Sequence, residues 1–174
     1  TFYTNKILIG KNDIFVYLSE NESFMSFYKD GAYISTKSQT NITEIIEKLK
    51  ANDIDFGVDA FYELLAQKGL DATQYEAQES ELFNFIESTF SQMLTKIQNV
   101  AMHNRSVFDF DTIDRLFFST PHGRIRGLKD FVLTFGLNDT EVLDFNLFKE
   151  KQTNHFLENV VASYGQDNIT THSD

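Results

Sequence analysis

The chain has 174 residues, 41% of them hydrophobic and 24% charged, with 18 Phe and 7 Tyr, which is the composition of one folded globular domain. Fifteen basic and 26 acidic residues give a net charge of −11, which disfavours binding to nucleic-acid phosphates and anionic lipid surfaces. The absence of Cys excludes disulfides, thiolate metal sites and thiol nucleophiles, and no apolar run approaches the roughly 20 residues that span a bilayer.

Three short apolar segments open the chain and predict an antiparallel meander. They cover Ile7–Leu18, Phe24–Tyr28 and Ala32–Thr36, and polar turns separate them. Asp30 followed by Gly31 is the strongest hairpin signal in the sequence, because a tight primed turn needs positive φ at both central residues.

The hydrophobic pattern then changes to the helical period. Asn41, with Glu44 three residues later, forms a capping-box pattern and predicts a helix over Thr40–Lys50. A second short helix is expected over Val58–Gln67. Another capping-box pattern at Thr73–Glu76 predicts the start of a helix of roughly 30 residues. Its apolar residues recur every three or four positions and are expected to form core: Leu82, Ile86, Phe90, Met93, Ile97 and Val100.

The last third of the chain alternates strands and helices. The order of three antiparallel strands, helices and then alternating elements predicts a mixed α/β architecture in which helices cover a sheet. The expected elements are a strand over Ile113–Phe118, a helix over Ile125–Phe135 closed by Gly136, a strand over Thr140–Leu143, a helix over Thr153–Tyr164 and a frayed end over Gln166–Asp174.

Two groups of residues suggest chemistry but lack the required spacing. Asp109, Asp111 and Asp114 have neither the central Gly nor the distal Glu of a calcium loop, so we interpret them as turn formers and a cap. The four histidines share no ligand spacing, and we expect no metal site: His103, His122, His155 and His172.

The turn Ser119–Gly123 offers a hydroxyl and an imidazole between a strand and a helix. It lacks the glycines of a nucleophile elbow, and no Gly-rich phosphate cradle is present elsewhere. A structural loop is therefore the favoured interpretation, and the residues alone identify no catalytic group.

The stretch Ile113–Phe131, a strand followed by a glycine-containing turn and a helix, resembles a signature of actin-like ATPases, closest to their pilus-assembly branch. The long helix Leu82–Ala101 before it and the strand Glu141–Leu143 after it agree in order. Upstream, the hairpins Ile7–Thr36 and the next helix resemble the start of the second lobe. The resemblance implies a ribonuclease-H-like lobe over residues 1–165, with 52–72 as a candidate small insertion and 166–174 as a flexible tail. With Thr1 in place of Met, we expect a fragment of a longer, two-lobed protein.

The nucleotide motifs of that family are degenerate in this chain. Leu8 stands where the family has the Asp of its phosphate loop, and Ala60, Phe61 and Leu64 occupy the helix that carries an acid and a base toward adenosine. Ser119, Thr120 and Pro121 replace a Gly-Gly turn. The resemblance therefore implies that the lobe binds no ATP in the family manner and has no cofactor. The positions that match nucleotide-facing turns, most of which we expect to be structural, are Gly10, Ser119, Thr120, Gly123 and Gly127.

By resemblance, the leading hypothesis is a non-catalytic protein-binding scaffold similar to the cytoplasmic actin-like component of a type IV pilus or type II secretion platform. Its partners would be the cytoplasmic tail of an inner-membrane assembly protein and a motor ATPase, at the inner face of a bacterial inner membrane. The second hypothesis is one lobe of an active ATPase or sugar-kinase-like enzyme whose catalytic residues lie in a missing half. The third is an unrelated α/β interaction domain, which a different strand order would select.

Overall fold

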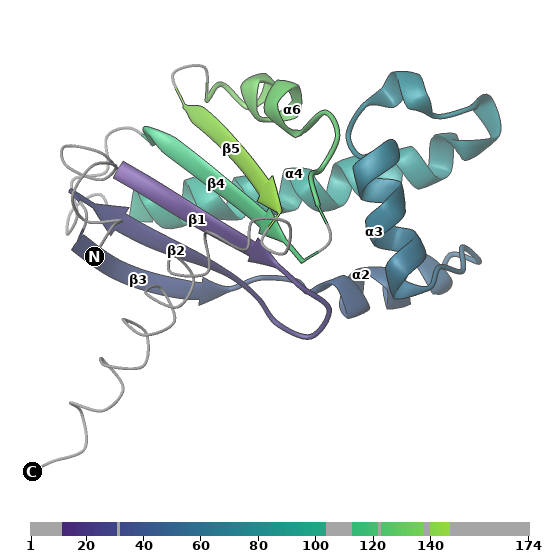
Figure 1. Ribbon diagram of the computed structural model, residues 1–174, viewed down its shortest axis with the longest axis horizontal. Coiled ribbons are helices and arrows are strands. Elements are labelled where there is room, and N and C mark those ends of the chain that lie inside the picture. Colours follow the sequence, from purple (N-terminus) through teal and green to yellow (C-terminus); the bar gives the residue numbers. More distant parts are fainter. Residues whose placement is uncertain (1–11, 31, 104–112, 122, 138–139, 147–174) are drawn as a thin grey trace, which may run out of the picture.

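Five strands form one mixed sheet in the order β3-β2-β1-β4-β5 (Figure 1). The computed structural model describes residues 12–30, 32–103, 113–121, 123–137 and 140–146. β1, β2 and β3 form an antiparallel meander, and β1, β4 and β5 run parallel. The strands are β1 (Asn12–Leu18), β2 (Ser23–Lys29), β3 (Ala32–Ser38), β4 (Arg115–Thr120) and β5 (Glu141–Asn146). This order and these directions are those of a ribonuclease-H-like sheet, so the predicted fold class is confirmed.

The meander follows the predicted turn chemistry. Asp30 has a φ of 52°, as the tight turn between β2 and β3 requires, while Gly31 lies outside the described residues. All six residues of β4 are buried, which agrees with the continuous apolar run expected of a strand covered on both faces. The predicted start of the first strand, residues 7–11, also lies outside the described ranges.

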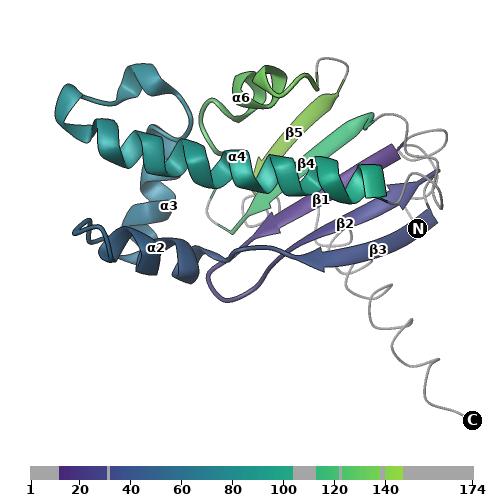
Figure 2. The ribbon, with the colours of Figure 1, turned by 180° about the vertical axis from the view of Figure 1, so that it is seen from behind.

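The long helix α4 (Ser80–His103) lies across one face of the sheet (Figure 2). Its buried residues include most of the predicted stripe, and the Phe90 ring lies 6.5 Å, centroid to centroid, from the ring of Phe118 in β4. Because Ile86, Met93 and Ile97 are buried in the same cluster, the stripe is confirmed as core.

The start of α4 differs from the prediction. The helix begins at Ser80 and has 24 residues, because the connector before it forms two short 3₁₀ turns, η1 (Ala72–Gln74) and η2 (Ala77–Glu79). The Asp71 carboxylate caps the first turn by accepting from the Thr73 amide at 3.1 Å. Glu76 and Glu79 form the capping box of the second turn. Both turns are therefore stabilised by acidic caps rather than by the expected Thr73 hydroxyl.

Two short helices agree with their predicted positions. In α2 (Ile42–Lys50) both hydrogen bonds of the capping box between Asn41 and Glu44 are present, and α3 (Val58–Gln67) has the predicted bounds and lies inside the segment 52–72. Both helices lie beyond the carboxyl ends of β1 and β4 (Figures 1 and 2). None of the helices in the described ranges combines the length and apolarity that a membrane crossing requires.

The last described helix, α6 (Leu128–Thr134), is shorter than predicted. Gly127 has a φ of 72°, a left-handed conformation that cannot continue into a helix, so the helix starts three residues late. Gly136 has a φ of 76° and follows the C-cap Phe135, as predicted. β5 extends to Asn146, beyond the predicted Thr140–Leu143. The predicted helix Thr153–Tyr164 and the end Gln166–Asp174 lie outside the described residues.

Candidate functional site

The carboxyl ends of β1, β4 and β5 meet at one edge of the sheet, where open α/β folds bind their ligands. Two described connections follow the ends of β1 and β4 here, the hairpin 19–22 and the loop between β4 and α6, and a third, residues 39–41, leads from β3 to α2 at the same edge. Four of the five predicted site residues lie here: Ser119 and Thr120 end β4, and Gly123 and Gly127 belong to the loop that follows. We therefore take this edge as the candidate site.

Ser119 and Thr120 end β4 inside the molecule. Ser119 is completely buried and its hydroxyl has no hydrogen-bond partner, whereas Thr120 is buried and its hydroxyl accepts from the Gly123 amide at 3.1 Å. The same Thr120 hydroxyl donates to the Gly123 carbonyl oxygen. Thr120 and Gly123 thus close a local turn in which the Ser119 hydroxyl takes no part. The fifth predicted position, Gly10, lies outside the described residues.

Gly127 packs tightly against the connector that precedes α4. A Cβ at this position would lie 2.8 Å from both the Asp71 nitrogen and the Leu70 carbonyl carbon. The Leu70 amide donates to the Arg126 carbonyl oxygen at 2.8 Å, which fixes this approach. The chain's own packing therefore explains a glycine here without a ligand.

Replacing Gly127 by Ala is expected to destabilise the fold by roughly 1–3 kcal/mol, because the side chain would meet backbone atoms and the φ of 72° is strained for Ala. Gly57 is the matched control: it is the N-cap of α3 with an ordinary φ of −76°, and nothing lies within 4 Å of its Cβ position. Urea unfolding should show Gly57→Ala within about 0.5 kcal/mol of the unaltered chain. Equal effects of the two substitutions would contradict this account of Gly127.

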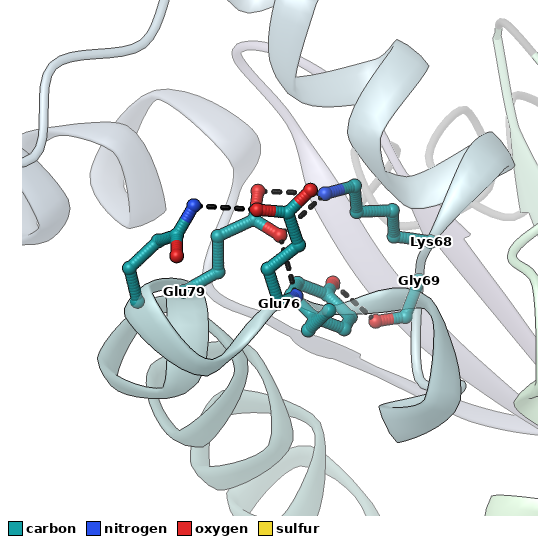
Figure 3. A network of polar contacts seen from close by, with 6 residues as sticks. Lys68, Gly69, Glu76 and Glu79 are labelled. Atoms are coloured by element: carbon teal, nitrogen blue, oxygen red, sulfur yellow. Dashed lines mark hydrogen bonds and ion pairs between the residues drawn. The ribbon is translucent and has the colours of Figure 1, made fainter.

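A polar network holds the connector in place (Figure 3). Lys68 donates to both carboxylate oxygens of Glu79 at 2.6 Å, and this hydrogen bonding lowers the pKa of the Glu79 carboxyl. The Tyr75 hydroxyl donates to the Gly69 carbonyl oxygen at 2.7 Å, and burial raises the pKa of Tyr75 to about 12. The network stabilises the connector against which the loop after β4 packs.

The hairpin after β1 is bonded to the start of α2. The amides of Ile42 and Thr43 donate to the carbonyl oxygens of Ser19 and Glu20 at 2.9 and 3.1 Å. These amides belong to the helix N-terminus, whose unpaired N–H groups would otherwise attract an anion. The hairpin also exposes the carboxylates of Glu20 and Glu22. Its charge and its hydrogen bonding both disfavour a phosphate at this position.

Neither the acidic residues nor the histidines form a described metal site. Asp114 Oδ2 accepts from the Asn12 amide at 2.6 Å, a contact between the starts of β1 and β4, while Asp109 and Asp111 lie outside the described residues. His103 ends α4, and the other three histidines are also outside the described ranges. Within those ranges no three His, Cys, Asp or Glu side chains come together.

The helix that would face adenosine is directed toward the core instead. Phe61 in α3 is 1% exposed, and Leu64 packs partly buried against the same core. Its exposed neighbour Ala60 carries no polar group.

An open hollow of about 380 Å³ lies beside α6, lined by Arg124, Ile125, Gly127, Leu128, Lys129, Asp130 and Val142.

A second region was not apparent from the sequence. Two hollows, of about 310 and 280 Å³, share Lys96 in their lining. Lys48 of α2 lines the first hollow and Lys37 of β3 lines the second. The three lysines come from three separate elements, so no local motif brings them together in the sequence. We call the two hollows, with Lys37, Lys48 and Lys96 in their lining, the basic groove.

No protein-family model and no curated protein sequence matches the chain. Among solved structures, the Alp12 filament structure matches with a TM-score of 0.52 and 14% identity over 94% of this chain and 51% of its own. The ethanolamine utilization protein EutJ from Carboxydothermus hydrogenoformans matches with a TM-score of 0.49 and 12% identity over 80% of this chain and 45% of its own. The chain spans about half the length of these structures. The strand order and the likeness to the Alp12 structure show that the chain has an actin-like, ribonuclease-H-like fold.

Proposed function

We propose that the chain is one lobe of an actin-like protein and acts as a non-catalytic protein-binding scaffold. The observation that carries this proposal is the internal hydrogen bonding of the loops at the candidate edge. Its two described loops are bonded to α2 and to the connector, through the Ile42 amide on one side and the Leu70 amide on the other. The Ile42 amide at the helix N-terminus and the backbone N–H and C=O of Arg126 in the loop are thus engaged in internal contacts.

The side chains at this edge support the same function. Exposed Glu20 and Glu22 place two negative charges beside the end of β1, where a nucleotide would bring several more. The backbone of Leu70 and Asp71 fills the space beside Gly127 that a Cβ would otherwise occupy, so this space is not open to a ligand. A lobe with these features is better suited to docking a protein than to clamping a polyphosphate.

The partners and location rest on the family resemblance. We propose the cytoplasmic tail of an inner-membrane assembly protein of a type IV pilus or type II secretion system as the main partner, with a motor ATPase as a second. The lobe would then work in the cytoplasm at the inner face of the membrane. The actin-like fold supports this assignment, and the net charge of −11 disfavours nucleic acid as a partner.

The competing function is a lobe of an active ATPase or sugar-kinase-like enzyme, and thermal unfolding separates the two. A nucleotide with a Kd of about 10 μM, added at 1 mM, stabilises its protein by about 2.7 kcal/mol, which raises the Tm by several degrees. We expect Mg-ATP to shift the Tm of the full-length protein by less than about 1 °C relative to MgCl₂ alone. A shift of several degrees would support the enzyme.

A further inference from the structure

The outer edge strand β3 lies beside the basic groove, and its carboxyl end reaches the candidate edge, where the amides of Gln39 and Ser19 both donate to Ser23. We propose that an extended acidic segment of a partner protein binds here by adding a strand to β3, with its carboxylates on Lys37 and Lys96. This inference rests on the proposed scaffold function and names the chemistry of its partner. Its residues contribute to neither loop of the candidate edge.

β3 offers backbone groups to an incoming strand. In the part of the chain that the structure describes, β3 pairs with β2 alone. The Gln39 amide donates to the Ser23 carbonyl oxygen at 2.8 Å, so Gln39 faces β2. Because backbone direction alternates along an antiparallel strand, Thr36 and Ser38 direct their N–H and C=O groups outward. An extended segment could pair with the N–H and C=O groups of Thr36 and with the Ser38 N–H, whereas the Ser38 carbonyl oxygen already accepts from Lys96.

The basic groove supplies charge along the same edge. Lys96 Nζ donates to the outward Ser38 carbonyl oxygen at 2.6 Å, which holds an exposed cation beside β3. Lys37 and Lys48 are exposed as well, and none of the described residues lining the two hollows is acidic. In a chain with a net charge of −11, this local concentration of lysines favours an acidic ligand.

The two faces of β3 predict the pattern of the bound segment. Lys37 lies on the α4 side, next to residues of that helix. On the opposite side, Tyr33 is 43% exposed and its hydroxyl donates to the Thr36 hydroxyl, which contacts Ser26. Since side chains alternate along a strand, the segment should carry Glu or Asp on one side and β-branched or aromatic residues on the other.

A second copy of this chain is a poor occupant of the same edge. Pairing two β3 strands would bring the Lys37 and Lys96 charges of both copies to one junction, and like charges across a sheet are destabilising. A partner with the opposite charge avoids this cost. Electrostatics therefore favours a different protein over self-association.

The test uses a fluorescent peptide of about seven residues that alternates Glu and Val, long enough for one strand. We expect saturable binding that weakens as salt rises, and about tenfold weaker binding to the double variant Lys37→Glu/Lys96→Glu. Both side chains are exposed, so circular dichroism should show an intact fold. Lys129→Glu is the matched control, because this exposed lysine lies in α6 beside the opposite edge of the sheet (Figure 1).

A second probe separates strand addition from simple charge attraction. The same peptide with N-methyl groups on the amides that would face β3 keeps its charge but cannot pair, and we expect it to lose binding. Three results would overturn the proposal: no binding of the unmodified peptide, equal binding of the methylated peptide, or an equal loss in Lys129→Glu. These results leave the nucleotide measurement untouched, so failure of this surface is distinguishable from failure of the scaffold function.

Discussion

Replacing Arg115 by Met is expected to destabilise the fold by about 3–5 kcal/mol, because it leaves the Asp13 carboxylate buried without its guanidinium. Arg115 Nε and Nη2 donate to Asp13 Oδ1 and Oδ2 at 2.7 and 2.6 Å. Asp13 is 1% exposed and Arg115 7%. The two residues are direct partners in the register of β1 and β4, so the bidentate pair joins the meander to the parallel half of the sheet.

Urea unfolding of two variants tests this interpretation. The double variant Asp13→Leu/Arg115→Met removes both charges and should recover much of the stability that the single variant loses, since a well-packed apolar pair can replace a buried ion pair. If Arg115→Met alone stays within about 1 kcal/mol of the unaltered chain, the pair does not stabilise the sheet in this way.

Phe118→Ala is expected to destabilise the fold by about 3–5 kcal/mol through loss of buried apolar area and the cavity that remains. Phe118 is completely buried in β4, and its ring lies beside that of Phe90 in α4. The substitution therefore weakens the contact between the sheet and its long helix. A loss this large is a substantial fraction of the 5–15 kcal/mol that stabilises an ordinary domain.

Met102 provides the control for the Phe118 substitution. It lies in the last turn of α4 and is 68% exposed, so Met102→Ala should change the free energy of unfolding by less than about 0.5 kcal/mol. Chemical denaturation monitored by circular dichroism measures both effects. A loss below about 1 kcal/mol for Phe118→Ala would show that the sheet and α4 are not packed as described.

Much of the fold could be predicted because local patterns agreed with it. Asn41 and Glu44 formed the capping box that begins α2, and the bounds of α3 matched because a short apolar period ends before Lys68 and Gly69. The start of α4 could not be placed from the sequence. Thr73 and Glu76 have the spacing of a capping box, but so do the acidic residues that form the caps in the structure. Only the connector's packing selects Asp71 and Glu76 instead.

The sites were harder to predict because they depend on contacts between distant segments. Gly127 was recognised as a special position, but its approach to Leu70 and Asp71 depends on a connector more than 50 residues earlier. The Asp13–Arg115 pair joins residues separated by 102 positions. The basic groove combines single lysines from three elements. Such sites have no spacing within one segment that a pattern could detect.

The measurement that tests the scaffold account most directly is a calorimetric titration of Mg-ATP into the full-length protein, with the present chain as control. The account predicts no saturable heat for either sample at nucleotide concentrations up to about 1 mM, which corresponds to a binding free energy weaker than about −4 kcal/mol. Micromolar binding to the full-length protein, about −8 kcal/mol, would contradict it and assign nucleotide chemistry to the protein.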